Sequence, residues 1–500
     1  MEKIKKYKAE IIHIALIILG IIFVSLGAFH TNIWFDESYS IALTNHSFME
    51  IWTIGGHDVH PILYYWLLKI VRIIFGNNIM IYKLFSVLPI AILSILGFTH
   101  IRKDFGKKVA LLFSFFVSFL PITSVYGVEI RMYSWAMLVV TLMAIYAYRI
   151  INNTSQKNIK NWIIFAIFSL ASAYTHYYGL IIAGITNLFL FIYLIILSRK
   201  EKKITINLKN FIISAIIQIL IYIPWLVFFI KQVGQVSGGF WIGFHFPETI
   251  IEALAFPFTG NLGSTLYVQN WIAIAFTIMM FTYALILILK NKNKINIQPA
   301  KYAIIAYFIV ILMVIVVSTI MGQVIFYARY MSVLTGLLIF FFSYIIAKLG
   351  NKYGNIVICI LTLALAIAVN VNLLKINYDT SNTKPINYIK ENIQEKDIFV
   401  YENDGAGFVV TANFPENTTY FWDRQNWGVG EAYKAYTPYT VYNLDDLKDY
   451  KGRIWAINSN SYNVANLILS TYDTTELIEQ KEFKTRYQNY EYTFSLIEKK

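Results

Sequence analysis

His30-Thr-Asn-Ile-Trp-Phe-Asp36-Glu37-Ser-Tyr-Ser40 follows directly on the first long apolar run of the chain. Two adjacent carboxylates stand here among aromatic side chains. Aromatic residues gather where a membrane helix meets water, and ionisable groups near the membrane are costly and usually functional. The stretch therefore predicts a membrane protein whose chemistry centres on Asp36 and Glu37.

The composition of the chain excludes an ordinary soluble protein. Of 500 residues, 57% are hydrophobic and 14% charged, whereas soluble domains average about 25% charged. The net charge of +13 could indicate a nucleic-acid partner, but the basic residues stand in short clusters between apolar runs rather than on one face. The single cysteine, Cys359, provides neither a disulfide nor a thiolate metal site. We predict a polytopic α-helical membrane protein, surrounded by membrane lipids, with no nucleic-acid partner.

Apolar runs long enough to cross a membrane number eleven, which predicts about eleven transmembrane helices. The first has no small-residue cleavage site after it, so we expect a retained helix and not a signal peptide. The runs lie at roughly 10–29, 79–101, 108–126, 131–150, 161–176, 179–198, 209–230, 271–290, 301–321, 331–349 and 355–375. We expect a helix break at Thr175-His-Tyr-Tyr-Gly179.

The loop charges predict the orientation. Loops on the side of the N-terminus hold 22 Lys and Arg residues, and loops on the opposite side hold 4. Because basic loops stay in the cytoplasm, we predict a multi-pass plasma-membrane protein with a cytoplasmic N-terminus and with Asp36 and Glu37 outside. An odd number of helices then places the polar tail outside as well.

Two domains are expected, a membrane domain at 1–375 and an extracytoplasmic α/β domain at 376–500. The tail has strand-length apolar runs and two helical segments between turns. They are a helix at 384–394, strands at 397–401 and 453–458, a helix at 463–472 and one or two strands within 483–497.

Two outer loops of the membrane domain are long. The first, about 30–78, is predicted to carry short juxtamembrane helices at 46–52 and 61–75 along the membrane surface. The second, 232–270, contains Trp241 and Phe246 among Gly and Pro residues, and it could fold over a substrate groove.

The acidic and imidazole residues of the first outer loop suggest chemistry. Asp36 and Glu37 are candidates for a general base, or for a base and a metal ligand, and the alternative is an N-terminal cap of the following helix. The segment His57-Asp58-Val-His60 adds carboxylate and imidazole groups. Asp36, Asp58 and His60 could bind a divalent cation, or the latter two could be ordinary turn residues. Nothing indicates an organic cofactor.

Lys83, Arg131 and Arg329 each lie near the start of a helix whose N-terminus is predicted to face outside. A helix N-terminus already favours anions, so a cation there is disfavoured unless an anion compensates it. The three together predict a phosphate site, and the alternative for each is snorkelling to lipid headgroups.

Polar and aromatic residues cluster at the same predicted helix ends. Tyr126, Glu129 and Tyr133 would share one face if this segment were helical, and Glu129 could orient a sugar hydroxyl or neutralise Arg131. Aromatics at such ends are also typical of the interfacial belt. The predicted substrate-binding residues are Lys83, Glu129, Arg131, Tyr133, His176, Tyr177, Arg329 and Tyr330.

In this order, the motifs resemble the GT-C superfamily of membrane glycosyltransferases, in particular the protein O-mannosyltransferases and aminoarabinose transferases of the glycosyltransferase family 39 type. The similar segments are Asp36-Glu37, His60-Pro-Ile-Leu-Tyr-Tyr-Trp66, Glu129-Ile-Arg-Met-Tyr-Ser134, His176-Tyr-Tyr-Gly179 and Ala328-Arg-Tyr-Met331. The tail resembles no motif of the family.

The resemblance implies a polyprenyl-phosphate-linked sugar donor, such as an undecaprenyl or dolichyl phosphate, and transfer with inversion. The acceptor would be a glycan, lipid or protein on the outer face. Asp36 would be the base for the acceptor hydroxyl or the ligand of a cation near the phosphate. Arg329 would neutralise the leaving phosphate, with Lys83 and Arg131 as further candidates.

Two functions from other classes compete with this interpretation. A transporter or flippase of lipid-linked glycans would place charged residues at the membrane midplane, but the helix centres here are almost free of charge. A non-catalytic envelope assembly protein would use the tail for binding, and the residues at the outer ends would then be incidental.

Overall fold

The computed structural model describes residues 2–152, 158–239, 242–243, 245, 247–260, 268–291, 296–402, 405–422, 430–436, 439–441, 444–458 and 463–500. The chain forms two compact units. The first contains Met1–Ala28 and Lys83–Val371, and the second contains Phe29–Tyr82 and Asn372–Lys500. The predicted first outer loop therefore shares a unit with the polar tail.

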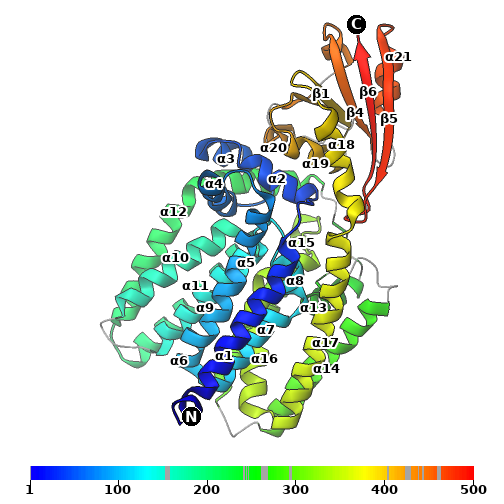
Figure 1. The fold of residues 1–500 in the computed structure, drawn as a ribbon. Helices are drawn as coiled ribbons and strands as arrows, with labels where there is room; N and C mark the ends of the chain where they lie inside the picture. Colours follow the sequence, from blue (N-terminus) through cyan, green and yellow to red (C-terminus); the bar gives the residue numbers. More distant parts are fainter. Residues whose placement is uncertain are drawn as a thin grey trace. The chain divides into compact units, whose positions relative to one another are not determined.

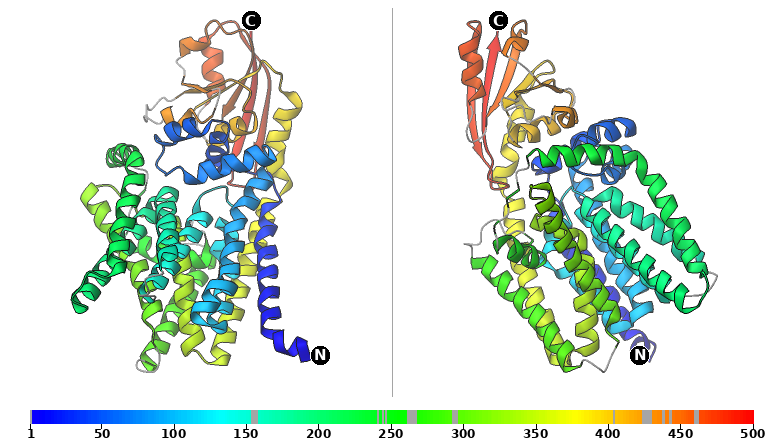
Figure 2. Two further views of the ribbon diagram at one scale, coloured as in Figure 1. Left: turned by 90° about the vertical axis from the view of Figure 1, so that its left-hand side faces the viewer. Right: turned by 180° about the vertical axis from the view of Figure 1, so that it is seen from behind.

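The first unit is helical, and its long helices run alongside one another in every view (Figures 1 and 2). Helices suit such apolar sequences because all their backbone groups are paired within the segment. The early elements are α1 (Glu2–Ser25), η1 (Leu26–Ala28), α5 (Ile79–Leu96), the π-helical turn η2 (Gly97–Ile101), α6 (Arg102–Phe105), α7 (Lys107–Phe119), α8 (Pro121–Tyr126), α9 (Tyr133–Asn152), α10 (Ile159–Thr175) and α11 (Tyr177–Lys200). The later ones are α12 (Ile206–Ser237), α13 (Glu248–Thr259), α14 (Val268–Lys290), α15 (Gln298–Met321), η3 (Ala328–Leu334), α16 (Thr335–Leu349) and α17 (Lys352–Asn377).

Nine helices in the described part of the chain are long and apolar enough to cross a membrane, which confirms a multi-pass membrane fold. Two of the eleven predicted spans fall short of this length. Helix α10 has 17 residues. The predicted span 108–126 is interrupted, because Leu120 is extended (ψ 136°) before Pro121 begins α8. A residue that precedes proline disfavours the α conformation, so the interruption has a local cause.

Two further predictions concern the ends of helices. The expected break at 175–179 is present, because α10 ends at Thr175, His176 is extended and α11 begins at Tyr177. The predicted outer loop 232–270 is partly helical, since α12 runs to Ser237 and α13 occupies Glu248–Thr259. Trp241 and Phe246 lie outside the described residues, so the proposed cover over a groove stays a prediction.

The second unit contains a six-stranded mixed sheet (Figure 1). The strand order is β3-β2-β1-β4-β6-β5; β3, β2, β1 and β4 pair in parallel, and β6 pairs antiparallel with β4 and β5. The elements are α2 (Phe35–Leu43), α3 (Phe48–Gly55), α4 (Leu63–Phe75), η4 (Thr380–Thr383), α18 (Lys384–Asn392), β1 (Ile398–Glu402), α19 (Gly405–Asn413), β2 (Thr419–Trp422), α20 (Gly430–Tyr433), β3 (Tyr439–Val441), η5 (Leu444–Leu447), β4 (Gly452–Asn458), α21 (Val464–Thr471), β5 (Thr475–Lys484) and β6 (Glu491–Lys499).

Neighbouring residues of a strand point to opposite faces of the sheet. Helices cover both faces here. Val400 of β1 packs on one side in a core that includes Ile468 of α21. On the other side, the ring of Tyr401 lies 5.1 Å from that of Phe408 in α19. The predicted small C-terminal α/β region is therefore confirmed as a layered α/β arrangement.

The short helices of residues 29–82 pack within this unit. Helix α2 contacts α19 and α4, and α3 contacts α20. Ser47 caps α3, because its hydroxyl accepts a hydrogen bond from the Glu50 amide and the Glu50 carboxylate accepts one from the Ser47 amide. Lys69 and Arg72 of α4 donate to the carbonyl and the hydroxyl of Thr44, respectively, so cations compensate the C-terminal end of α2.

Candidate active site

Glu37 is integrated into the start of α2. Its side chain is 0% exposed, and its carboxylate accepts hydrogen bonds from the Trp34 amide (3.2 Å) and from the Tyr487 hydroxyl (3.0 Å). An acidic residue in the first turn also suits the positive end of the helix dipole. Glu37 is thus a capping residue that joins α2 to the β5–β6 turn, and its predicted catalytic role stays a prediction.

Asp36 occupies the same first turn but faces different neighbours. It is half-buried, and its charge acts on the phenol of Tyr436. Tyr436 shares a hydrogen bond of 2.8 Å with Ser38. Burial raises the pKa of Tyr436 well above its usual value, the bond to Ser38 opposes this shift, and the charge of Asp36 adds to it. Asp36 therefore lies beside a phenol that stays protonated near neutral pH.

Asp58 and His60 form a second pair in this unit. The carboxylate of Asp58 lies 3.3 Å from Nδ1 of His60 and accepts a hydrogen bond of 3.3 Å from the Tyr65 hydroxyl. The ring of Tyr39 lies 5.9 Å from that of Tyr65 and 6.2 Å from that of Tyr436. The rings of Tyr436, Tyr39 and Tyr65 thus form a continuous path from the start of α2 to Asp58. We call the following residues the carboxylate cluster: Asp36, Glu37, Asp58, His60, Tyr39, Tyr65 and Tyr436.

The described residues offer an incomplete set of metal ligands. No three His, Cys, Asp or Glu side chains come together anywhere in the described part of the chain. Zinc sites are usually built from three or four such ligands, whereas Mg²⁺ is bound by one or two carboxylates together with substrate phosphates. The predicted cation at Asp36, Asp58 and His60 stays a prediction.

Arg329 is the centre of a second cluster, in the first unit. It lies in η3, whose turn is closed by a hydrogen bond of 2.6 Å from the Ser332 hydroxyl to the Arg329 carbonyl. Its guanidinium lies 5.1 Å from the ring centre of Tyr327, 5.9 Å from that of Tyr330 and 6.0 Å from that of Tyr133. Aromatic faces attract a cation at these distances, so the guanidinium is held among tyrosines.

Tyr133 brings several predicted residues together. Its hydroxyl lies within the electrostatic range of Arg329, Arg131 and Glu129. It is buried, and it has no hydrogen-bond partner among the described residues. Since buried polar groups are almost always paired, this hydroxyl is suited to bind a polar ligand.

His176 holds the same region through the break between α10 and α11. Its Nδ1 accepts a hydrogen bond of 3.0 Å from the Tyr178 amide, so the neutral ring carries its proton on Nε2. The ring lies 5.0 Å from that of Tyr330 and 5.9 Å from that of Tyr133. The term arginine–tyrosine cluster is used below for Glu129, Arg131, Tyr133, His176, Tyr327, Arg329 and Tyr330.

The segment 127–132 between α8 and α9 is not helical. The predicted shared helical face of Tyr126, Glu129 and Tyr133 therefore does not form. The ring of Tyr126 nevertheless lies 5.1 Å from that of Tyr133, because the turn folds back between the two helices.

Two other predicted residues lie in the same unit. Lys83 is 1% exposed and sits in α5, and the indole of Trp135 in α9 donates to the carbonyl of Phe85. This hydrogen bond joins the N-terminal parts of α5 and α9. Lys83 therefore lies near the start of α9, which follows Arg131 in the chain. Tyr177 contacts α12, where Trp225 donates to its hydroxyl (3.2 Å), and its substrate-binding role stays a prediction.

Residues 59–228 match the sequence model of a family described as dolichyl-phosphate-mannose-protein mannosyltransferase. The crystal structure of ArnT from Cupriavidus metallidurans bound to undecaprenyl phosphate superposes with a TM-score of 0.65, covering 98% of each chain at 11% sequence identity. The apo crystal structure of the same ArnT gives a TM-score of 0.49 at 11% identity, covering 97% of each chain. No curated protein matches the chain. The chain shares the fold of this undecaprenyl-phosphate-bound ArnT structure.

This GT-C similarity confirms the predicted resemblance. The matched segment includes His60, Glu129, Arg131 and His176, whereas Asp36 and Arg329 lie outside it. The roles of the last two residues therefore depend on the chemistry of their surroundings.

Tyr436 and Tyr487 contact α2 beside Asp36 and Glu37 but were not predicted from the sequence. Both come from the tail, about 400 and 450 residues along the chain from the groups that they contact. The only local signal is the repeated tyrosine in 433–442 and 487–492, which is also typical of an ordinary aromatic core.

Proposed function

We propose that the protein is an integral membrane glycosyltransferase that moves a sugar from a polyprenyl-phosphate-linked donor to an acceptor on the outer face of the membrane, with inversion. The observation that carries the proposal is the arginine–tyrosine cluster in a chain of GT-C fold. The ArnT structure of the same fold contains undecaprenyl phosphate, which supports a lipid phosphate as part of the donor.

The arginine–tyrosine cluster fits the donor. A lipid phosphate leaves with negative charge, and fixed cations stabilise that charge as it develops. Arg329 has a planar guanidinium that can bind two phosphate oxygens at once, and Arg131 and Lys83 would add positive charge. Glu129, the Tyr133 hydroxyl, His176, Tyr177 and Tyr330 would bind the hydroxyls of the donor sugar.

Asp36 fits the acceptor. The acceptor oxygen would attack the anomeric carbon on the face opposite the phosphate, and its proton would pass to the Asp36 carboxylate. The bond between the anomeric carbon and the phosphate oxygen breaks at the same time, and its electron pair stays with the lipid phosphate. A single displacement of this kind inverts the anomeric configuration.

The distribution of charge supports chemistry on the outer face. Asp36 and Arg329 are both in loops of the side that holds 4 basic residues, against 22 on the other. If basic loops are retained in the cytoplasm, both residues would be outside, on the side where an envelope acceptor is available.

The replacement Asp36→Asn tests this proposal. Asp36 lies in the first turn of α2, whose N-cap is Trp34, and asparagine keeps the size and shape of its side chain, so the variant should insert and fold like the wild type. Loss of a general base should lower the transfer rate by about two or more orders of magnitude, measured with a radiolabelled polyprenyl-phosphate sugar in reconstituted membranes. The control is Asp473→Asn, at an exposed position after α21, which should transfer normally. Wild-type transfer by Asp36→Asn would remove Asp36 from the site.

A chelator separates the two predicted roles of Asp36. We propose that Asp36 acts as the base, because its carboxylate can accept the proton of the acceptor hydroxyl directly. Wild-type activity should then survive treatment with EDTA. Loss of activity that a divalent cation restores would instead assign Asp36 to a metal site.

A further inference from the structure

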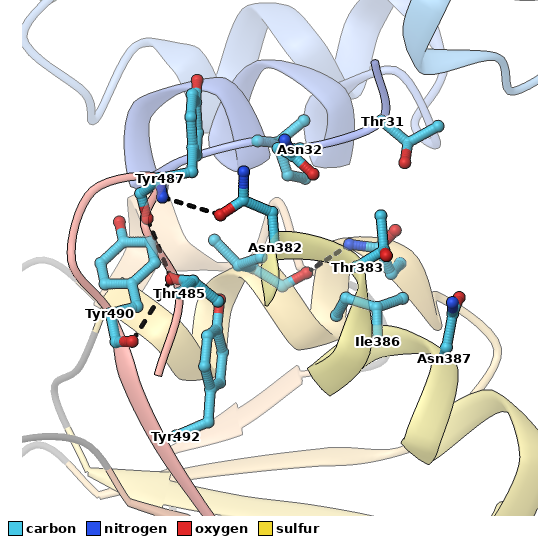
Figure 3. Close-up of a pocket in the computed structure, with 13 residues that line it drawn as sticks. Thr31, Asn32, Asn382, Thr383, Ile386, Asn387, Thr485, Tyr487, Tyr490 and Tyr492 are labelled. Carbon is cyan, nitrogen blue, oxygen red and sulfur yellow. Dashed lines mark hydrogen bonds between the residues drawn. The ribbon is translucent and has the colours of Figure 1, made fainter. Parts of the chain in front are cut away.

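A pocket opens in the second unit, close to the start of α2 (Figure 3). It is open to solvent and has an accessible volume of about 50 Å³, so it is a shallow site that a ligand would rest on rather than one that encloses a ligand. Three segments form it: the chain before α2, the η4–α18–α19 region and the β5–β6 turn. The lining residues are Thr31, Asn32, Ile33, Asn382, Thr383, Ile386, Asn387, Val409, Asn413, Thr485, Tyr487, Tyr490 and Tyr492.

The lining is polar without being charged. It consists of asparagine, threonine and tyrosine with three aliphatic residues, and it contains no Lys, Arg, His, Asp or Glu. A chain with a net charge of +13 could readily have provided a cation. Phosphate and carboxylate ligands are usually held by Arg or Lys, so this lining suits a neutral ligand with many hydroxyl groups.

Some polar groups hold the pocket together, and others remain available to a ligand. Asn382 accepts hydrogen bonds from the amides of Arg486 (3.0 Å) and Tyr487 (2.8 Å), which fixes the β5–β6 turn (Figure 3). The side chains of Thr31, Thr383 and Asn387 are exposed and make no hydrogen bond within the described part of the chain. Hydroxyl and amide groups both donate and accept, as recognition of sugar hydroxyls requires.

The tyrosines of the pocket contribute apolar surface as well as hydrogen bonds. A phenol ring combines a broad apolar face with a polar tip, and a sugar ring likewise has C–H faces and hydroxyl edges. The rings of Tyr490 and Tyr492 lie 5.9 Å apart at 78°, so they present two differently oriented surfaces to a ligand.

The pocket is fixed relative to Asp36 by two of its own lining residues. The hydroxyl of Tyr490 accepts a hydrogen bond of 3.1 Å from the Phe35 amide. The hydroxyl of Tyr487 donates one of 3.0 Å to the Glu37 carboxylate. The residues on both sides of Asp36 are thus bonded to the pocket wall, so a ligand bound here would lie at a defined position with respect to that carboxylate.

We infer that this pocket binds an uncharged saccharide unit of the acceptor, so that the acceptor is a neutral glycan. That the saccharide belongs to the acceptor rests on the proposed function, whereas saccharide binding itself does not. The acceptor is positioned by the tail, and the lipid-linked donor is bound through the membrane helices.

Saturation-transfer NMR on the full chain in nanodiscs tests the inference. The probes are methyl glycosides of neutral hexoses and N-acetylhexosamines, with methyl glucuronides as the anionic counterparts, and all are measured in an Arg329→Ala background so that the proposed donor site contributes little. The neutral sugars should bind, and the anionic ones should bind more weakly. Asn387→Ala should weaken neutral binding about twofold to tenfold, the usual effect of one hydrogen bond. Asn392→Ala, an exposed position on the same helix outside the pocket, should bind as the wild type does.

Three results would overturn the inference: no binding of neutral sugars, equal binding of the anionic sugars, or equal affinity in Asn387→Ala and Asn392→Ala. The proposed function fails separately. If Asp36→Asn transferred sugar at the wild-type rate while Asn387→Ala still lost saccharide affinity, the base would be misassigned and the pocket would stand. If neutral sugars did not bind but Asp36→Asn abolished transfer, the pocket inference would fail and the assignment of Asp36 as the base would stand.

Discussion

The carboxylate of Glu37 accepts two hydrogen bonds, one from Trp34 and one from Tyr487, and it is fully buried. Asp36, its neighbour, is half-buried, and its charge acts on the phenol of Tyr436. Successive helix residues point about 100° apart, so adjacent acids at a helix start can serve different purposes. We therefore expect substitutions at the two positions to affect different measurements.

Glu37→Gln should leave transfer nearly unchanged, because the amide oxygen can still accept from the Trp34 amide and the Tyr487 hydroxyl. Glu37→Ala leaves buried donors unpaired and should cost about 1–3 kcal/mol of stability. Thermal unfolding in detergent and the transfer rate, measured together, distinguish these effects, and Tyr487→Phe serves as a control that removes one of the two bonds. A loss of transfer in Glu37→Gln as large as in Asp36→Asn would show that Glu37 is catalytic.

Arg329→Ala should weaken the use of the lipid-linked donor about tenfold to a hundredfold, the range for a hydrogen bond to a charged group. Arg329→Lys should restore part of this loss, since lysine keeps the charge but lacks the planar fork. The measurement is the transfer rate as a function of donor concentration. Arg199→Ala, at an exposed position near the end of α11, is the control. Unchanged donor dependence in Arg329→Ala would place the phosphate elsewhere.

The corner between α10 and α11 positions the ring of His176 in the arginine–tyrosine cluster, and it depends on the absence of a side chain at Gly179. A Cβ atom there would approach the Ser172 carbonyl oxygen to 2.2 Å, and a backbone atom cannot rotate away. The corner is thus held by close backbone packing in addition to the hydrogen bond between His176 and Tyr178.

Gly179→Ala should therefore destabilise the protein by about 1–3 kcal/mol, the usual cost of overpacking, and should impair donor use by displacing His176. Gly184→Ala is the matched control on the same helix, because no atom lies within 4 Å of a Cβ built there. Alanine is favoured over glycine inside a helix, so the control should be neutral or slightly stabilising. Thermal unfolding of the two variants tests this difference, and equal stability would contradict the packing argument.

Sequence patterns predicted the elements that depend on local composition. Long apolar runs such as 209–230 became helices, and the short apolar run at 397–401 became β1. The proline at position 121 causes the interruption between α7 and α8. It lies within a continuous apolar run, and the run predicted a single helix. Strands β2 and β3 have four and three residues, which is too short for a period to be recognised. They are defined by their pairing, β2 with β1 and β3 with β2.

The candidate site was predictable to the extent that its residues lie in motifs. Arg131, Tyr133, His176 and Arg329 were identified, because charged and aromatic residues at helix ends are conspicuous in an apolar chain. The contacts of Tyr436 and Tyr487 with α2 could not be predicted, because they join segments about 400 residues or more apart. Nor does any local pattern show that the lining of the pocket is free of charge.

Across the chain, the orientation in the membrane determines whether the proposed chemistry takes place on the outer face. Basic loops hold 22 Lys and Arg residues on one side and 4 on the other. The side with few basic residues carries Asp36 and Arg329, and the positive-inside rule assigns it to the exterior. The two orientations make opposite predictions for the accessibility of the tail and of the basic loops.

A membrane-impermeant maleimide can test the orientation, because the chain has one cysteine, Cys359, which lies in α17. In a Cys359→Ser background, Asn392→Cys in α18 and Lys203→Cys after α11 each place a thiol at an exposed position. We expect Asn392→Cys to react in intact cells, and Lys203→Cys to react only after permeabilisation, because Lys203 belongs to the most basic loop. The Cys359→Ser parent, which has no thiol, gives the background. If Lys203→Cys reacted in intact cells and Asn392→Cys did not, the tail and Asp36 would be cytoplasmic, and an acceptor on the outer face could not reach the proposed base.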